Sequence, residues 1–203
     1  IANLFAVRQQ NLKRLLAFSS IAQVGFLLIG LSAHSQTGAT SVLFFLLIYL
    51  FSNLAAFGVV SILSSVYGKE DIIQLSGLYK THPFLSWVLA LALFSLAGIP
   101  PTAGFFGKFF LLLSGAGVTN SSKYWIIGFA AINMVISLYY YLRVVKTIFM
   151  NHDPELSSEA DSPKYPIAFP VRMALIICLA GLLIVGFLGG FYQHIFQLLN
   201  GIN

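Results

Sequence analysis

Lys108 is the residue whose type and setting most clearly suggest chemistry. It lies in an apolar stretch that runs from Ser86 to Leu113 and contains no acidic residue. Ionisable residues inside membrane segments are costly unless protein or water surrounds them, and by default they mark functional sites. Because burial disfavours the charged form of an amine, small changes in hydration can load or unload its proton. We therefore expect Lys108 to bind and release a proton or another cation.

The same stretch contains a helix break at Gly98, Pro100 and Pro101. The break lies two turns before Lys108. Consecutive prolines remove two backbone donors and free carbonyl groups one turn earlier, around residues 94–96. Freed carbonyls can coordinate an ion or hold water. Two alternatives stay open: the break is a kink that serves packing alone, or its carbonyls simply hold the Lys108 ammonium.

Three polar residues, Gln23, Tyr49 and Asn53, lie inside other apolar runs. Tyr49 and Asn53 are four residues apart, so they share one face of a helix. Together with Gln23 they can form a hydrated path at mid-depth. Interhelical hydrogen bonding is the alternative, because polar side chains in membrane helices often join neighbouring helices.

Lys13 is the second candidate for proton transfer. It lies beside Arg14 near the start of an apolar run, where a lysine can also extend its amine to the membrane surface. The six acidic residues all lie between the apolar runs, at Glu70, Asp71, Asp153, Glu155, Glu159 and Asp161. A lysine relay in this chain is therefore expected to lack a carboxylate partner of its own. Its counter-charge would come from another part of the assembly.

The composition predicts an all-α membrane protein that crosses the bilayer several times. Of 203 residues, 58% are hydrophobic and 8% are charged, whereas soluble domains have about 25% charged residues. The net charge of +5 does not indicate nucleic acid, because the basic residues are scattered near the ends of apolar runs. The single Cys178 excludes an intrachain disulfide, and the sequence has no metal-ligand cluster or glycine-rich phosphate loop.

The apolar runs predict about five transmembrane helices, because a helix needs about 20 apolar residues to span a bilayer. Their expected ranges are about 12–33, 40–65, 84–117, 123–150 and 171–196. The third range contains the break. Residues 66–83 are polar with one apolar side and predict a short interfacial helix, and residues 151–169 predict an exposed loop.

Residues 84–117 are long enough for one broken, tilted crossing or for two short crossings. Basic residues favour the cytoplasmic side of a membrane. With one crossing, every lysine and arginine apart from Lys108 and Lys123 falls on the same side. With two crossings, the basic residues divide almost evenly. The sequence therefore favours five crossings over six, with the basic side in the cytoplasm.

Three motifs occur in order along the chain. They are Lys-Arg-Leu-Leu-Ala-Phe-Ser-Ser within residues 11–25, Ser-Leu-Ala-Gly-Ile-Pro-Pro-Thr-Ala-Gly-Phe-Phe-Gly-Lys-Phe at 95–109, and Tyr-Tyr-Tyr-Leu-Arg at 139–143. With these motifs the chain resembles the subunit N family of proton-pumping NADH–quinone oxidoreductase, respiratory complex I. The first motif is shared with other antiporter-like subunits and with multisubunit sodium/proton antiporters, and the second is more specific.

The resemblance implies a fold of about fourteen helices in two inverted repeats. Residues 1–203 would supply the second repeat, as the C-terminal part of a single antiporter-like transmembrane domain. Lys108 would lie beside the broken helix, at the proton-release end of a lysine file at mid-membrane, and Lys13 would lie on the hydrated axis of that file. Gln23 replaces a histidine that is often found in the family, and Tyr49 and Asn53 occupy places where a sister subunit has ionisable residues.

The function implied by the resemblance is proton translocation in the membrane arm of NADH:quinone oxidoreductase, coupled to quinone reduction elsewhere in the complex. The chain is expected to have no redox site and no cofactor of its own, with FMN, iron–sulfur clusters and quinone in other subunits. The expected partners are other membrane-arm subunits, the missing N-terminal half and the lipid bilayer, but no nucleic acid.

The expected location is a bacterial inner (plasma) membrane, in preference to a mitochondrial or plastid inner membrane. Two alternatives to this function remain at the level of sequence. One is a subunit of a multisubunit Na+/H+ antiporter or of a membrane-bound hydrogenase. The other is a structural spacer of the membrane arm.

Overall fold

A computed structural model of the chain describes residues 1–117, 123–150, 168–187 and 190–200. Within these residues every regular element is a helix. Four helices are long and apolar enough to cross a membrane, at Leu12–Ser32, Gln36–Tyr67, Tyr124–Phe149 and Phe169–Gly186. The chain is therefore a multi-pass membrane protein, as its composition predicts.

The helices follow one another along the chain with short connections. In order they are α1 (Ala2–Val7), α2 (Leu12–Ser32), α3 (Gln36–Tyr67), the 3-10 helix η1 (Ile72–Leu75), α4 (Leu78–Thr81), α5 (Pro83–Ala97), α6 (Ala103–Ala116), α7 (Lys123–Phe149), α8 (Phe169–Phe187) and α9 (Gly190–Asn200). Local sequence explains several of the starts. The side chains of Asn11 and Ser35 cap α2 and α3, each accepting a hydrogen bond from the backbone N–H three residues later, at 3.2 and 3.1 Å. Pro83 opens α5 at a position where its missing N–H costs no helical hydrogen bond.

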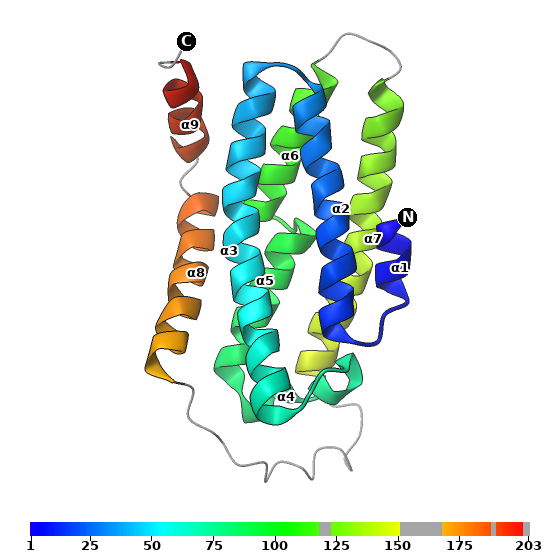
Figure 1. Ribbon diagram of the computed structural model, residues 1–203, viewed down its shortest axis with the longest axis vertical. Coiled ribbons are helices and arrows are strands. Elements are labelled where there is room, and N and C mark those ends of the chain that lie inside the picture. Colours follow the sequence, from blue (N-terminus) through cyan, green and yellow to red (C-terminus); the bar gives the residue numbers. More distant parts are fainter. Residues whose placement is uncertain (118–122, 151–167, 188–189, 201–203) are drawn as a thin grey trace.

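Helices α5 and α6 stack end to end and together cross the bundle once (Figure 1). Helix α5 starts at the end where α4 lies, and α6 finishes near the connection between α2 and α3. The prediction of a single broken crossing, and with it of about five transmembrane segments, is confirmed. Neither half is long enough to span a membrane by itself, because each has only 14 or 15 residues.

The last predicted span, 171–196, is not a single helix. Helix α8 ends at Phe187, and α9 begins as a separate helix at Gly190. Tyr192 of α9 stacks on Phe110 of α6 with 4.2 Å between ring centroids, and its hydroxyl lies 3.2 Å from the Ser41 hydroxyl of α3. Helix α9 therefore packs against α3 and α6 through Tyr192. The predicted loop at 151–169 lies almost wholly outside the described residues, and so do Asp153, Glu155, Glu159 and Asp161.

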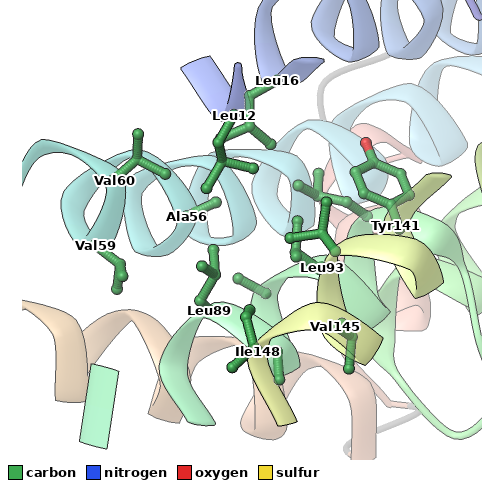
Figure 2. Close-up of a cluster of buried hydrophobic side chains, with 14 of the residues drawn as sticks. Leu12, Leu16, Ala56, Val59, Val60, Leu89, Leu93, Tyr141, Val145 and Ile148 are labelled. Atoms are coloured by element: carbon green, nitrogen blue, oxygen red, sulfur yellow. The ribbon is translucent and has the colours of Figure 1, made fainter. Parts of the chain in front are cut away.

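The largest buried cluster joins α2, α3, α5 and α7 (Figure 2). The labelled side chains are Leu12, Leu16, Ala56, Val59, Val60, Leu89, Leu93, Tyr141, Val145 and Ile148. Helix α5 lies at the centre of this cluster, and its residues Leu85, Leu89 and Leu93 are completely buried. The core therefore fixes α5, and with it the helix break that follows.

Candidate functional site

Lys108 lies in the second turn of α6, and its side chain is completely buried. Its Nζ donates a hydrogen bond to the backbone carbonyl of Leu96 at 2.6 Å and a longer one to that of Ala97 at 3.4 Å. Both carbonyls belong to the last turn of α5. The amine of one half-helix is thus held on the carbonyl end of the other half.

The end of α5 explains why these two carbonyls are available. Gly98 adopts a left-handed conformation with φ 79°, which favours glycine. The N–H groups of Gly98 and Ile99 bond back to the carbonyls of Phe94 and Ser95, as in a Schellman cap. The carbonyls at 94 and 95 are therefore occupied by the backbone, so the prediction that places the freed carbonyls around 94–96 is only partly right. The lysine uses the carbonyls of Leu96 and Ala97.

Gly104 allows the two half-helices to approach each other closely. A Cβ atom at this position would overlap the backbone carbonyl oxygen of Ser95. The Ser95 hydroxyl in turn accepts a hydrogen bond from Ser52 of α3 at 2.9 Å. Close contact at Gly104 brings the start of α6 against the end of α5, and this contact places Lys108 over the freed carbonyls.

Gln23 of α2 shares an acceptor with Lys108. Its Nε2 donates to the Leu96 carbonyl at 3.0 Å, and the Tyr141 hydroxyl lies 3.5 Å from the same nitrogen. The side chain is 1% exposed, yet its Oε1 has no hydrogen-bond partner among the described residues. Buried acceptors of this kind are usually satisfied by a bound water. Gln23 therefore lies beside Lys108, and its part in a hydrated path stays a prediction.

Within the described residues, the groups that contact the Lys108 amine are all neutral. Its Nζ lies 5.1 Å from the ring centroid of Phe26, a distance that suits a cation–π contact. The one ion pair found among the described residues joins Lys13 to Glu70 and does not involve Lys108. Whether a carboxylate partner of Lys108 exists elsewhere in the assembly stays a prediction.

A chain of buried polar groups extends from Gln23 toward α1. The Tyr141 hydroxyl lies 2.5 Å from the Ser19 hydroxyl, and the Tyr140 ring lies 4.5 Å from the Tyr141 ring. The Tyr140 hydroxyl donates to Asn3 Oδ1 at 3.0 Å. Sequence reasoning did not assign Asn3 or Tyr140 to the site. Their polar side chains in apolar surroundings were the available signal, but only the fold shows that they meet.

Tyr49 and Asn53 form no hydrogen bond with this network within the described residues. Both are partly buried on α3, and Tyr49 stacks on Phe45 with 6.1 Å between centroids. None of the hydrogen bonds that Gln23 and Lys108 make within the described residues goes to either of them. A hydrated path through Tyr49 and Asn53 stays a prediction without a geometric link to Lys108.

Lys13 lies near the start of α2, as its place in the apolar run predicts, and far from the helix break. It is the second residue of α2, and its side chain is 43% exposed. Its Nζ donates to Glu70 Oε1 at 2.7 Å and to Ser64 Oγ at 2.6 Å. The helix begins only one residue earlier, at the end of the bundle that holds the interfacial segment, and this placement keeps the amine at the surface. A role in proton transfer stays a prediction.

Glu70 corrects a second expectation, that no lysine of a relay has a carboxylate partner in this chain. It follows α3 in sequence and lies against the start of α2, because the backbone N–H of Leu12 donates to its carbonyl at 2.9 Å. The hydrogen bonds from Lys13, Ser64 and Asn11 lower the pKa of Glu70 from 4.5 to about 2. The pair anchors the segment that holds η1 and α4, in which the predicted interfacial helix takes the form of two short helices.

Comparison with known proteins agrees with this architecture. A family model described as NADH:quinone oxidoreductase/Mrp antiporter, TM, matches residues 1–137. NADH-quinone oxidoreductase subunit N of Azobacteroides pseudotrichonymphae is 44% identical over 203 residues, which are 100% of this chain and 41% of that protein. NAD(P)H-quinone oxidoreductase subunit 2 of Nostoc punctiforme is 40% identical over 193 residues, covering 93% of this chain and 36% of that protein.

Solved structures show the same fold. A chain of respiratory complex I from Thermus thermophilus with bound aureothin matches with a TM-score of 0.75 and 31% identity, covering 93% of this chain and 41% of that chain. A chain of the Mrp complex from Dietzia sp. matches with a TM-score of 0.79 at 23% identity, covering 98% and 43%, and this likeness concerns the fold alone. The present chain spans about two fifths of the length of the curated relatives it matches. Since the family model covers more than half of the chain and the relatives match nearly all of it, the chain belongs to the NADH:quinone oxidoreductase/Mrp antiporter family of membrane subunits.

Proposed function

We propose that this chain is part of a proton-translocating membrane-arm subunit of an NADH:quinone oxidoreductase, in which Lys108 takes up and releases the transported proton. The observation that carries this proposal is the complete burial of the Lys108 amine on the Leu96 carbonyl. An amine without a carboxylate partner in apolar surroundings is easily switched between its charged and neutral forms. The sequence relatives named NADH-quinone oxidoreductase subunit N point to the same assembly.

The surroundings of Lys108 suit both forms of its amine. A carbonyl oxygen accepts a hydrogen bond from an ammonium and from a neutral amine, so the bond to Leu96 can persist through the cycle. The unpartnered Oε1 of Gln23 offers a place for a water molecule beside the same carbonyl. Arrival of water would stabilise the charged form, and its removal would favour proton release. Hydration would thus control whether Lys108 holds or releases its proton.

In this proposal the redox chemistry takes place in other subunits. FMN, iron–sulfur clusters and quinone would be bound elsewhere in the complex, and quinone reduction would drive the hydration change around Lys108. The partners would be other membrane-arm subunits, the rest of the antiporter-like domain and the lipid bilayer. The membrane would be a bacterial inner membrane, since several relatives are bacterial and cyanobacterial.

The test is proton pumping by the complete complex, reconstituted in vesicles, with Lys108→Ala and with the volume-matched Lys108→Met. Lys80→Met, which removes an exposed cation, is the matched control. We expect both Lys108 variants to assemble and to lose proton pumping by on the order of tenfold or more, while the control pumps normally. Unchanged protons per NADH oxidised in assembled Lys108 variants would contradict the role.

The same preparations separate the alternatives. A structural spacer predicts that Lys108→Ala impairs assembly but leaves the proton-to-electron ratio of the assembled fraction intact. A subunit of a secondary antiporter or of a membrane-bound hydrogenase predicts that the purified assembly does not oxidise NADH. NADH oxidation that depends on quinone, together with loss of pumping in Lys108→Met, would exclude both alternatives.

A further inference from the structure

One face of α7 is exposed along its length and ends in two basic residues. The side chains of Ile132, Val135 and Tyr139 are 58%, 67% and 60% exposed. Arg143 and Lys146 continue this series at intervals of four and three residues, so all five share one face of the helix. The face is therefore apolar in its middle and cationic at the end where α4 and the start of α2 lie.

A pocket of about 480 Å³ opens at the basic end of this face. Its walls come from the α1–α2 connection, the interfacial segment and the last turns of α7. The lining residues are Gln10, Asp71, Ile72, Ile73, Arg143, Lys146 and Thr147. The pocket thus lies at one end of the membrane-crossing helices.

The charges of the pocket favour an anion. Arg143 Nη1 donates to the Val7 carbonyl at 3.3 Å, which fixes the guanidinium beside the α1–α2 connection. Neither Arg143 nor Lys146 is in an ion pair within the part of the chain that the structure describes. Among the described residues that line the pocket, two cations face one carboxylate, that of Asp71.

We propose that this pocket binds the phosphate headgroup of an anionic phospholipid, whose acyl chains lie along the face formed by Ile132, Val135 and Tyr139. Arginine and lysine side chains bind phosphate oxygens through charge-assisted hydrogen bonds. Basic pockets at the ends of membrane helices are suited to anionic headgroups. A free phosphate ion would use the pocket alone. A phospholipid also uses the exposed apolar face that continues from it, so the combination favours lipid.

The proposal is tested by lipid binding to the complete purified complex after delipidation. The test variant carries Arg143→Gln and Lys146→Gln together. The control variant carries Arg14→Gln and Lys80→Gln, which remove the same charge from exposed positions at the same end of the bundle. Phosphatidylglycerol is added in nanodiscs, with phosphatidylcholine as the neutral probe, and bound lipid is counted by native mass spectrometry. We expect phosphatidylglycerol affinity to fall by on the order of tenfold or more in the first pair. Affinity that is unchanged in the first pair, or equally reduced in the control, would overturn the proposal.

Two further measurements identify the occupant. Inorganic phosphate at millimolar concentration should not displace phosphatidylglycerol, whereas full displacement would show that the pocket recognises phosphate alone and would overturn the lipid assignment. A photoreactive benzoylphenylalanine in place of the exposed Tyr139 should form adducts with phospholipid in intact membranes. Adducts with another subunit would show that protein covers this face and would likewise overturn the proposal. The substitution at Tyr139 lies on the surface, so it should not disturb folding.

Discussion

Lys108 of α6 and Gln23 of α2 donate hydrogen bonds to the same backbone carbonyl, that of Leu96, at 2.6 and 3.0 Å. No helix backbone N–H takes this carbonyl, because α5 ends at Ala97 and is capped by Gly98. The shared acceptor couples the proposed proton carrier to a polar side chain on another helix.

The first prediction concerns Gln23→Leu. Loss of the amide removes one donor from the Leu96 carbonyl and also the unpartnered oxygen that can hold water. We expect the assembled complex to pump protons about fivefold more slowly, the equivalent of one net hydrogen bond, while Lys108 keeps its own bond. Proton pumping is measured in vesicles. The control is Gln9→Leu, which removes an amide side chain from the α1–α2 connection. Equal rates in the two variants would mean that Gln23 does not assist Lys108.

The second prediction concerns Gly104→Ala. The new Cβ would overlap the Ser95 carbonyl, a backbone atom that cannot rotate away. We expect a loss of roughly 3 kcal/mol or more in stability, seen as a lower melting temperature or a lower yield of the assembled complex. Gly128→Ala on α7 is the matched control, because its Cβ meets nothing within 4 Å. Equal behaviour of both variants would contradict the close packing of α6 on α5.

The third prediction concerns the pH dependence of the Lys13–Glu70 pair. Hydrogen bonds from Lys13, Ser64 and Asn11 lower the pKa of Glu70 from 4.5 to about 2. Because the folded pKa is lowered, the pair stabilises the interfacial segment fully above about pH 4.5 and loses this effect as the pH falls toward 2. Hydrogen–deuterium exchange of residues 69–82 should therefore show additional opening across this range. Glu70→Gln should show the opening at every pH, and a wild-type segment that stays protected at pH 2 would refute the assignment.

The fourth prediction concerns chemical access to the two lysines. Lys108 is completely buried, whereas the side chain of Lys13 is 43% exposed. An amine-reactive ester applied to the detergent-solubilised complex should label Lys13 and the exposed Lys80 and leave Lys108 almost unlabelled. Peptide mass spectrometry after digestion measures the ratio. Comparable labelling of Lys108 and Lys80 would show that solvent reaches the proposed proton carrier freely, against the burial described here.

The sequence by itself determined the all-α membrane class, the helix break and the unusual position of Lys108, and it favoured a single broken crossing. Each of these follows from local properties: the length of an apolar run, the effect of two prolines on a helix, and the cost of an ammonium in hydrocarbon. It also located the start of α2 at Leu12 and the length of α7 closely. It did not separate α9 from α8.

The tertiary structure alone decided which groups meet. Gln23 and Leu96 are 73 residues apart in sequence, and Tyr140 and Asn3 are 137 apart. No periodicity or spacing reports such pairs. The same holds for Lys13 and Glu70, which lie 57 residues apart in sequence and form an ion pair. Hydrophobic runs fix how often a chain crosses a membrane, but the contacts between crossings are fixed only when the helices pack.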